Sequence, residues 1–138
     1  MKKFTFLYLL VVLSYINTGV ALELVIKGKN TAQFDVKVTR TPKEQAHGLM
    51  YVKSMPVNMG MLFLFEQEKE VYFWMKNTYI PLDIIFFDKD NMIVKIVKNT
   101  IPFSEKTLAS DVQVKGALEV NAGIIDKYKI RVGDKVQF

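Results

Sequence analysis

The chain has 138 residues, a net charge of +5, one histidine and no cysteine. This length predicts a single folded domain, and the lack of cysteine excludes disulfide bonds and thiol nucleophiles. The basic residues are scattered, with the densest group near the C-terminus, which is typical of a solvated face rather than of a binding patch.

Residues 1–21 are typical of a secretory signal peptide. Two lysines follow the first methionine, an uncharged apolar run spans Phe4–Leu13, and small residues occupy Gly19 and Ala21. The apolar run is shorter than the roughly 20 residues that span a membrane. We therefore expect cleavage after Ala21 and a mature domain of residues 22–138, exported to the periplasm or the extracellular space. An uncleaved anchor is the alternative. Nucleic acid is not an expected partner of an exported protein.

Short strands begin the mature domain. Leu24–Ile26 is apolar, and Gln33–Thr39 alternates apolar with polar residues, so both ranges predict β-strands. The sequence TPKE at 41–44 has threonine at the N-cap, proline at the first helical position and glutamate at the third, which is a capping box. Gly48 suits the position after the last helical residue. This segment therefore predicts a helix of about two turns.

Two further pairs of strands follow. Met61–Phe65 and Val71–Met75 are apolar runs of strand length, and the charged residues between them predict a turn over Glu66–Glu70. Leu82–Phe87 and Met92–Val97 flank a polar stretch of four residues and predict a hairpin.

The C-terminal part continues the same pattern. We expect an irregular connection over Asn99–Val112, a strand at Gly116–Val120, a short helix at Gly123–Lys129 and a last strand at Lys135–Phe138. Many short strands with one or two short helices predict a mostly β, single-domain β-sandwich or partly open barrel.

Few kinds of chemistry are open to this sequence. It has no nucleophile elbow, no glycine-rich phosphate loop and no closely spaced zinc ligands, so we expect no cofactor and no metal. His47 is placed at a helix end, where a capping or surface role is common. Five methionines follow it closely and would suit Cu(I), although methionine more often fills gaps in a core; they are Met50, Met55, Met59, Met61 and Met75.

The segment 73–87 mixes polar residues with a long apolar run around Trp74, the only tryptophan. Asp83 shares a strand face with Ile85 and Phe87. A buried carboxylate on that face is costly unless it is paired. Lys76 and Asn77 are near in sequence and are candidate partners.

A second polar pair lies in the predicted strand near the C-terminus. Glu119 and Asn121 are two residues apart and face the same way among apolar neighbours. These groups either satisfy one another structurally or converge with Asp83 in a cleft beside Trp74.

The chain resembles the family known as domain of unknown function 192, small bacterial and archaeal proteins that are often exported. The resemblance spans nearly the whole mature chain and lies in ordered motifs: GLM (48–50), GMLF (60–63), FWMKNT (73–78), IPLDI (80–84), LEVNAG (118–123) and GD (133–134). It departs at His47 and Val52, where the family tends to carry basic residues. The resemblance implies a mostly β fold and no established activity.

We expect an exported, monomeric domain, free of the membrane after signal cleavage, that binds a small polar molecule such as an envelope saccharide. The expected ligand-binding residues, which hold the family's motif positions, are Trp74, Lys76, Asn77, Asp83, Glu119 and Asn121. Whether the protein is an enzyme stays open, with a binding role favoured. One alternative is a glycan hydrolase that uses Asp83 and Glu119 as an acid/base pair. Another is an envelope scaffold or a Cu(I)-binding protein.

Overall fold

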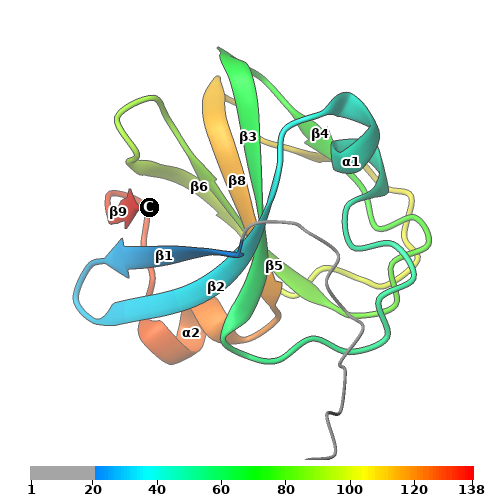
Figure 1. The fold of residues 1–138 in the computed structure, drawn as a ribbon, viewed down its shortest axis with the longest axis horizontal. Helices are drawn as coiled ribbons and strands as arrows, with labels where there is room; N and C mark the ends of the chain where they lie inside the picture. The colour runs from blue at the N-terminus through cyan, green and yellow to red at the C-terminus, as the bar shows by residue number, and fades with distance from the viewer. Residues whose placement is uncertain (1–20) are drawn as a thin grey trace, which may run out of the picture.

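The computed structural model describes residues 21–138. All of the predicted signal peptide except Ala21 lies outside the described residues. Within them, strands dominate, as the sequence pattern predicts (Figure 1).

Seven strands form one sheet in the order β6-β5-β8-β3-β2-β1-β9. In chain order they are β1 (Ala21–Lys27), β2 (Thr31–Thr39), β3 (Met59–Lys69), β5 (Leu82–Phe87), β6 (Ile93–Val97), β8 (Val114–Asn121) and β9 (Lys135–Gln137). Neighbouring strands are antiparallel, except that β2 and β3 are parallel. The sheet curls into a half-barrel, so the mostly β prediction is confirmed in its partly open barrel form.

Three kinds of smaller element cover the sheet. A two-stranded ribbon pairs β4 (Tyr72–Phe73) with β7 (Leu108–Ala109). The helices are α1 (Pro42–His47) and α2 (Ile124–Tyr128). Long loops complete the covering beside α1 and the ribbon (Figure 1).

The capping box predicted at the start of α1 is confirmed. The Glu44 backbone N–H donates to the Thr41 hydroxyl at 3.2 Å, and the Thr41 N–H donates to the Glu44 carboxylate at 3.4 Å. Backbone N–H groups that donate to the Glu44 carboxylate, first that of Arg40 and then that of Thr41, lower the pKa of Glu44. Gly48 follows the helix with a φ of 50°, in the left-handed region that suits glycine.

The sheet is buried on both faces. One core contains Leu62, Ile85 and Leu118 and is closed by residues of α2. The other contains Phe63 and Ile84, which alternate with the first set along their strands. All six residues of β5 are buried, because this strand lies between the two cores. That position explains why its sequence, apart from Asp83, is apolar at successive residues rather than at alternate ones.

The hairpin of β5 and β6 is confirmed, whereas the turn predicted over Glu66–Glu70 is wrong. β3 continues as far as Lys69, which lies opposite Val114 after a shift of register between Leu64 and Lys69. The charged residues there belong to a strand end that leaves the core, and Glu66 is exposed. A run of charged residues marks exposure, and exposure alone does not distinguish a turn from a projecting strand. Similarly, the connection predicted as irregular contains β7.

Candidate functional site

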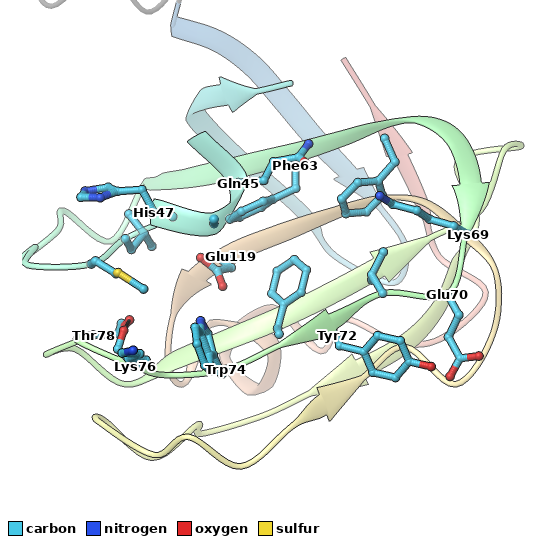
Figure 2. A pocket seen from close by; sticks show the side chains of 17 residues that line it. Gln45, His47, Phe63, Lys69, Glu70, Tyr72, Trp74, Lys76, Thr78 and Glu119 are labelled. Carbon is cyan, nitrogen blue, oxygen red and sulfur yellow. Dashed lines mark hydrogen bonds between the residues drawn. The ribbon is translucent and has the colours of Figure 1, made fainter. Parts of the chain in front are cut away.

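A cavity of about 300 Å³ lies between α1, the β4 segment and the second core face of the sheet (Figure 2). Its size is at the lower end of the range for small-molecule sites. Its lining residues are Gln45, Ala46, His47, Gly48, Leu49, Met50, Phe63, Phe65, Lys69, Glu70, Val71, Tyr72, Phe73, Trp74, Lys76, Thr78 and Glu119.

Aromatic side chains from β3 and the β4 segment form part of the cavity walls. The Phe63 and Phe73 rings pack at 5.0 Å between centroids, and Phe73 packs edge-on against Phe86 at 5.5 Å. Phe63 and Phe65 both project from β3 toward this side, because alternate residues of a strand share a face. These packed rings give the cavity preformed apolar walls.

Glu119 projects from β8 into this cavity (Figure 2). Its cross-strand neighbours are Met61 and Ile84, both buried, and the glutamate itself is only 5% exposed. No described residue donates a hydrogen bond to its carboxyl group, whose oxygens open onto the cavity. Burial raises the pKa of Glu119 to about 8, so the protonated form predominates at pH 7.

Two lysines lie along the edge of the cavity, each against an aromatic ring. The Lys76 Nζ is 5.1 Å from the centre of the Trp74 ring, and the Lys69 Nζ is 5.2 Å from that of Phe65. Neither lysine forms an ion pair with a described residue. Trp74 itself is 46% exposed and offers an aromatic surface next to the cavity.

Asp83 lies on the opposite face of the sheet from Glu119. Asp83 pairs with Val120 across β5 and β8, whereas Ile84 pairs with Glu119, so the two carboxylates project to different cores. The Asp83 side chain is fully buried. Asp83 therefore lies outside the cavity, and it does not form an acid/base pair with Glu119 as the hydrolase alternative required.

The Asp83 carboxylate instead accepts hydrogen bonds from three backbone N–H groups. Its Oδ1 accepts a hydrogen bond from Asn99 at 2.9 Å, and its Oδ2 accepts from Gly123 and Ile125, both at 3.0 Å. These bonds connect β5 to the loop after β6 and to the first turn of α2. The arrangement satisfies the carboxylate with donors of the main chain, so Asp83 has a structural role.

Asn77 and Asn121 are not part of the cavity lining, and each makes contacts elsewhere. The Asn121 Nδ2 donates to the Met55 carbonyl at 2.7 Å and so attaches the loop before β3 to β8. Asn77 has a φ of 52°, and its carbonyl accepts from the Tyr51 N–H at 2.9 Å. Of the six predicted site residues, the cavity therefore brings together Trp74, Lys76 and Glu119.

Several cavity residues were not expected from the sequence, chiefly Phe63, Phe65 and Phe73. Their apolar character indicates burial, and nothing in the sequence separates a cavity wall from a filled core. His47 also lines the cavity, and the centre of its ring is 6.1 Å from the centre of the Tyr51 ring.

Two further observations concern metals and membranes. No group of three or more histidine, aspartate or glutamate side chains within residues 21–138 is placed to hold a metal ion. Of the methionines weighed for Cu(I), Met61 and Met75 are buried in the second core, whereas Met59 is exposed. Among the described helices, none has the length and apolar character needed to cross a bilayer.

The chain is a small half-barrel β domain, in which one buried carboxyl group opens onto a cavity lined in part by aromatic side chains. The chain belongs to the DUF192 family, described as "Uncharacterized ACR", whose profile matches residues 24–138. The resemblance seen in the sequence motifs is thereby confirmed. A comparison with curated proteins found no match.

Two solved structures are similar to this chain. One is a protein of unknown function from Novosphingobium aromaticivorans DSM 12444, with 34% identity and a TM-score of 0.84 over 86% of this chain and 85% of that one. The other is a "putative transcription regulator" from Sinorhizobium meliloti 1021, with 34% identity and a TM-score of 0.82 over 83% of this chain and 91% of that one.

Proposed function

We propose that this protein binds a small polar ring ligand, such as an envelope saccharide, in the cavity beside Trp74. The observation that carries this proposal is the Glu119 carboxyl group, which is buried, opens onto the cavity and has no hydrogen-bond partner among residues 21–138. A buried polar group without a partner is costly. A ligand that supplies hydrogen bonds to Glu119 would remove that cost.

The remaining lining suits the same kind of ligand. Sugar rings have apolar faces that pack on aromatic side chains, and Trp74 offers such a surface at the cavity edge. Lys76 provides a hydrogen-bond donor near this surface, and the Thr78 hydroxyl, which donates its proton to the Lys76 carbonyl at 3.0 Å, can accept a hydrogen bond. Apolar walls with a few convergent polar groups are the usual composition of a small-molecule site.

A role in DNA recognition has less support in this chain. One similar structure carries a regulator's name, and a recognition helix in the major groove is a common reading element of such proteins. The described helices of this chain have only six and five residues. They are too short to present the several side chains that read base edges.

Trp74 is a natural reporter for the binding test, because it is the only tryptophan and lines the cavity. Tryptophan fluorescence would be followed while monosaccharides and envelope glycan fragments are added. We expect a saturable change in the parent protein. Calorimetry on Trp74→Ala should then show loss of binding, whereas Tyr79→Ala should retain it, since Tyr79 is similarly exposed but lies outside the cavity lining. Equal binding by both variants would contradict the proposed site.

Export is part of the same proposal, because it decides which ligands the protein meets. The basic start, apolar run and small residues of the N-terminus support it. We expect the intact mass of protein from the exported fraction to lack residues 1–21. A mass that retains them would favour an anchor.

A further inference from the structure

Two lysine ammonium groups of the described chain lie at the edge of the cavity, but neither forms an ion pair with Glu119. Lys69 and Lys76 lie over Phe65 and Trp74, and neither pairs with the glutamate. No described cation therefore forms an ion pair with Glu119, the buried one of the two carboxyl groups that line the cavity. A positive charge that meets this group has to come from the ligand.

The walls beside Glu119 suit a cation as well. An ammonium group within about 6 Å of an aromatic ring is attracted by the negative face of that ring. The two lysines already show that Phe65 and Trp74 accept ammonium groups in this way. Phe63 lines the same cavity as Glu119 (Figure 2), and so does Phe73.

We infer that the ligand carries a protonated amine, which pairs with the Glu119 carboxylate inside the aromatic walls of the cavity. This inference rests on the proposed function and names the ligand class, an amine-bearing ring compound such as an amino sugar. A hydrogen bond between two charged groups is about twice as strong as a neutral one. A neutral hydroxyl would gain only the weaker bond.

Formation of this pair at neutral pH displaces one proton. The Glu119 carboxyl releases its proton to solvent, the ligand keeps its own, and the resulting carboxylate accepts hydrogen bonds from the ammonium group. Since burial raises the pKa of Glu119 to about 8, the affinity for a permanently protonated amine should rise with pH up to that value and then level off. The slope should approach tenfold per pH unit.

The other titratable groups around Glu119 act differently on such a ligand. His47 comes from α1, Lys69 and Glu70 from the end of β3 and beyond, and Lys76 from the loop after β4; Tyr72 in β4 also lines the cavity, and its pKa is raised by a hydrogen bond to Glu70. The lysines should repel an amine, so Lys76→Met is expected to strengthen slightly the binding of an amine without hydroxyl groups, such as cyclohexylamine, to which Lys76 has no hydrogen bond to donate. An anionic ligand would show the opposite change.

The test compares ligands that differ only in the amine. One pair is 6-amino-6-deoxyglucose and glucose, and the other is cyclohexylamine and cyclohexanol. Binding to the full chain is measured by Trp74 fluorescence at pH 6, 7 and 8, and by calorimetry in two buffers of different ionisation enthalpy, which counts released protons. We expect each amine to bind at least tenfold more tightly than its partner at pH 8. We also expect about one proton released per amine bound at pH 7.

Two variants give the controls. Glu119→Gln should abolish the preference for amines and the proton release, whereas Glu70→Gln makes the same chemical change at the cavity edge and should keep both. His47→Gln should also keep the pH dependence, which separates Glu119 from the histidine that ordinarily titrates in this range. If Glu119→Gln fails to fold, carboxyl ¹³C NMR of the parent protein decides, because saturating cyclohexylamine should lower the pKa of Glu119.

The outcomes separate the two proposals. Equal affinity for glucose and its amino derivative, without proton release, would overturn the amine inference and keep the saccharide site. Binding of cyclohexylamine alone would keep the amine inference and remove the saccharide. If no probe changes the fluorescence or the pKa of Glu119, both proposals are wrong.

Discussion

The sharpest prediction concerns Asp83→Asn, which removes a buried charge while almost preserving the shape of the side chain. In the parent protein three backbone N–H groups, from Asn99, Gly123 and Ile125, donate to the carboxylate at 2.9–3.0 Å. An asparagine has one oxygen acceptor, and its NH2 group is a donor. At least one of the three N–H groups must then face another donor inside the protein.

The cost can be worked out from this geometry. If the asparagine oxygen keeps the bonds to Gly123 and Ile125, the Asn99 N–H loses its acceptor, and because Asn99 is an exposed residue this loss costs about 1 kcal/mol, the low end for an unpaired group. The two retained bonds change from charged to neutral acceptors and lose roughly 1 kcal/mol each. We therefore expect Asp83→Asn to lower the free energy of unfolding by about 3 kcal/mol, a large share of the 5–15 kcal/mol typical of a domain.

Urea denaturation measures this change directly. The midpoint should fall with little change in the slope m, because the same surface is exposed on unfolding. Glu119→Gln is the matched control, since it makes the same substitution of amide for carboxyl on the other face of the sheet, where no hydrogen bond from a described residue is lost. A loss below about 1 kcal/mol for Asp83→Asn would refute the structural role of this carboxylate.

Three further predictions test other parts of the structure. Because burial raises the pKa of Glu119 to about 8, the folded state keeps a proton that the unfolded state releases, so stability should fall as pH rises from about 5 to 8. Urea midpoints of Glu119→Gln should lack this fall. Thr41→Ala removes the side-chain acceptor of the Glu44 N–H and should cost about 1 kcal/mol, with an unchanged fold by circular dichroism. Gly116→Ala would place a methyl group on the Phe87 ring and should lower the free energy of unfolding by about 1–3 kcal/mol in the same urea assay.

Local structure followed from the sequence where a few adjacent residues decide it. The capping box of α1 depends on Thr41, Pro42 and Glu44 alone, and the hairpin of β5 and β6 on two apolar runs with a polar turn. The end of β3 could not be predicted from the sequence. Its pairing with β8 resumes after a shift of register, which depends on residues distant in sequence.

The candidate site shows the same limit at the level of single residues. The sequence correctly grouped Asp83 with Ile85 and Phe87 on one face of a strand. Whether Glu119 shares that face depends on how β5 and β8 are aligned, and a slip of one residue would exchange the faces of a whole strand. Because β5 is apolar on both sides, its pattern carries no information about that alignment. The convergence of Asp83 with Glu119 was therefore beyond what the strand pattern could decide.

The two buried carboxyl groups differ in what their surroundings supply. Asp83 receives three main-chain donors, so its charge contributes to the stability of the folded chain. Glu119 receives none from the described residues, and its ionisation opposes folding above about pH 5. A glutamine at 119 would avoid that cost with almost the same shape, so stability alone does not explain a glutamate there. Under the proposed function, a ligand that supplies the missing partner would offset this cost. Residues that lower the stability of the folded state without making a stabilising interaction are expected at functional sites. Glu119 is such a residue in this cavity.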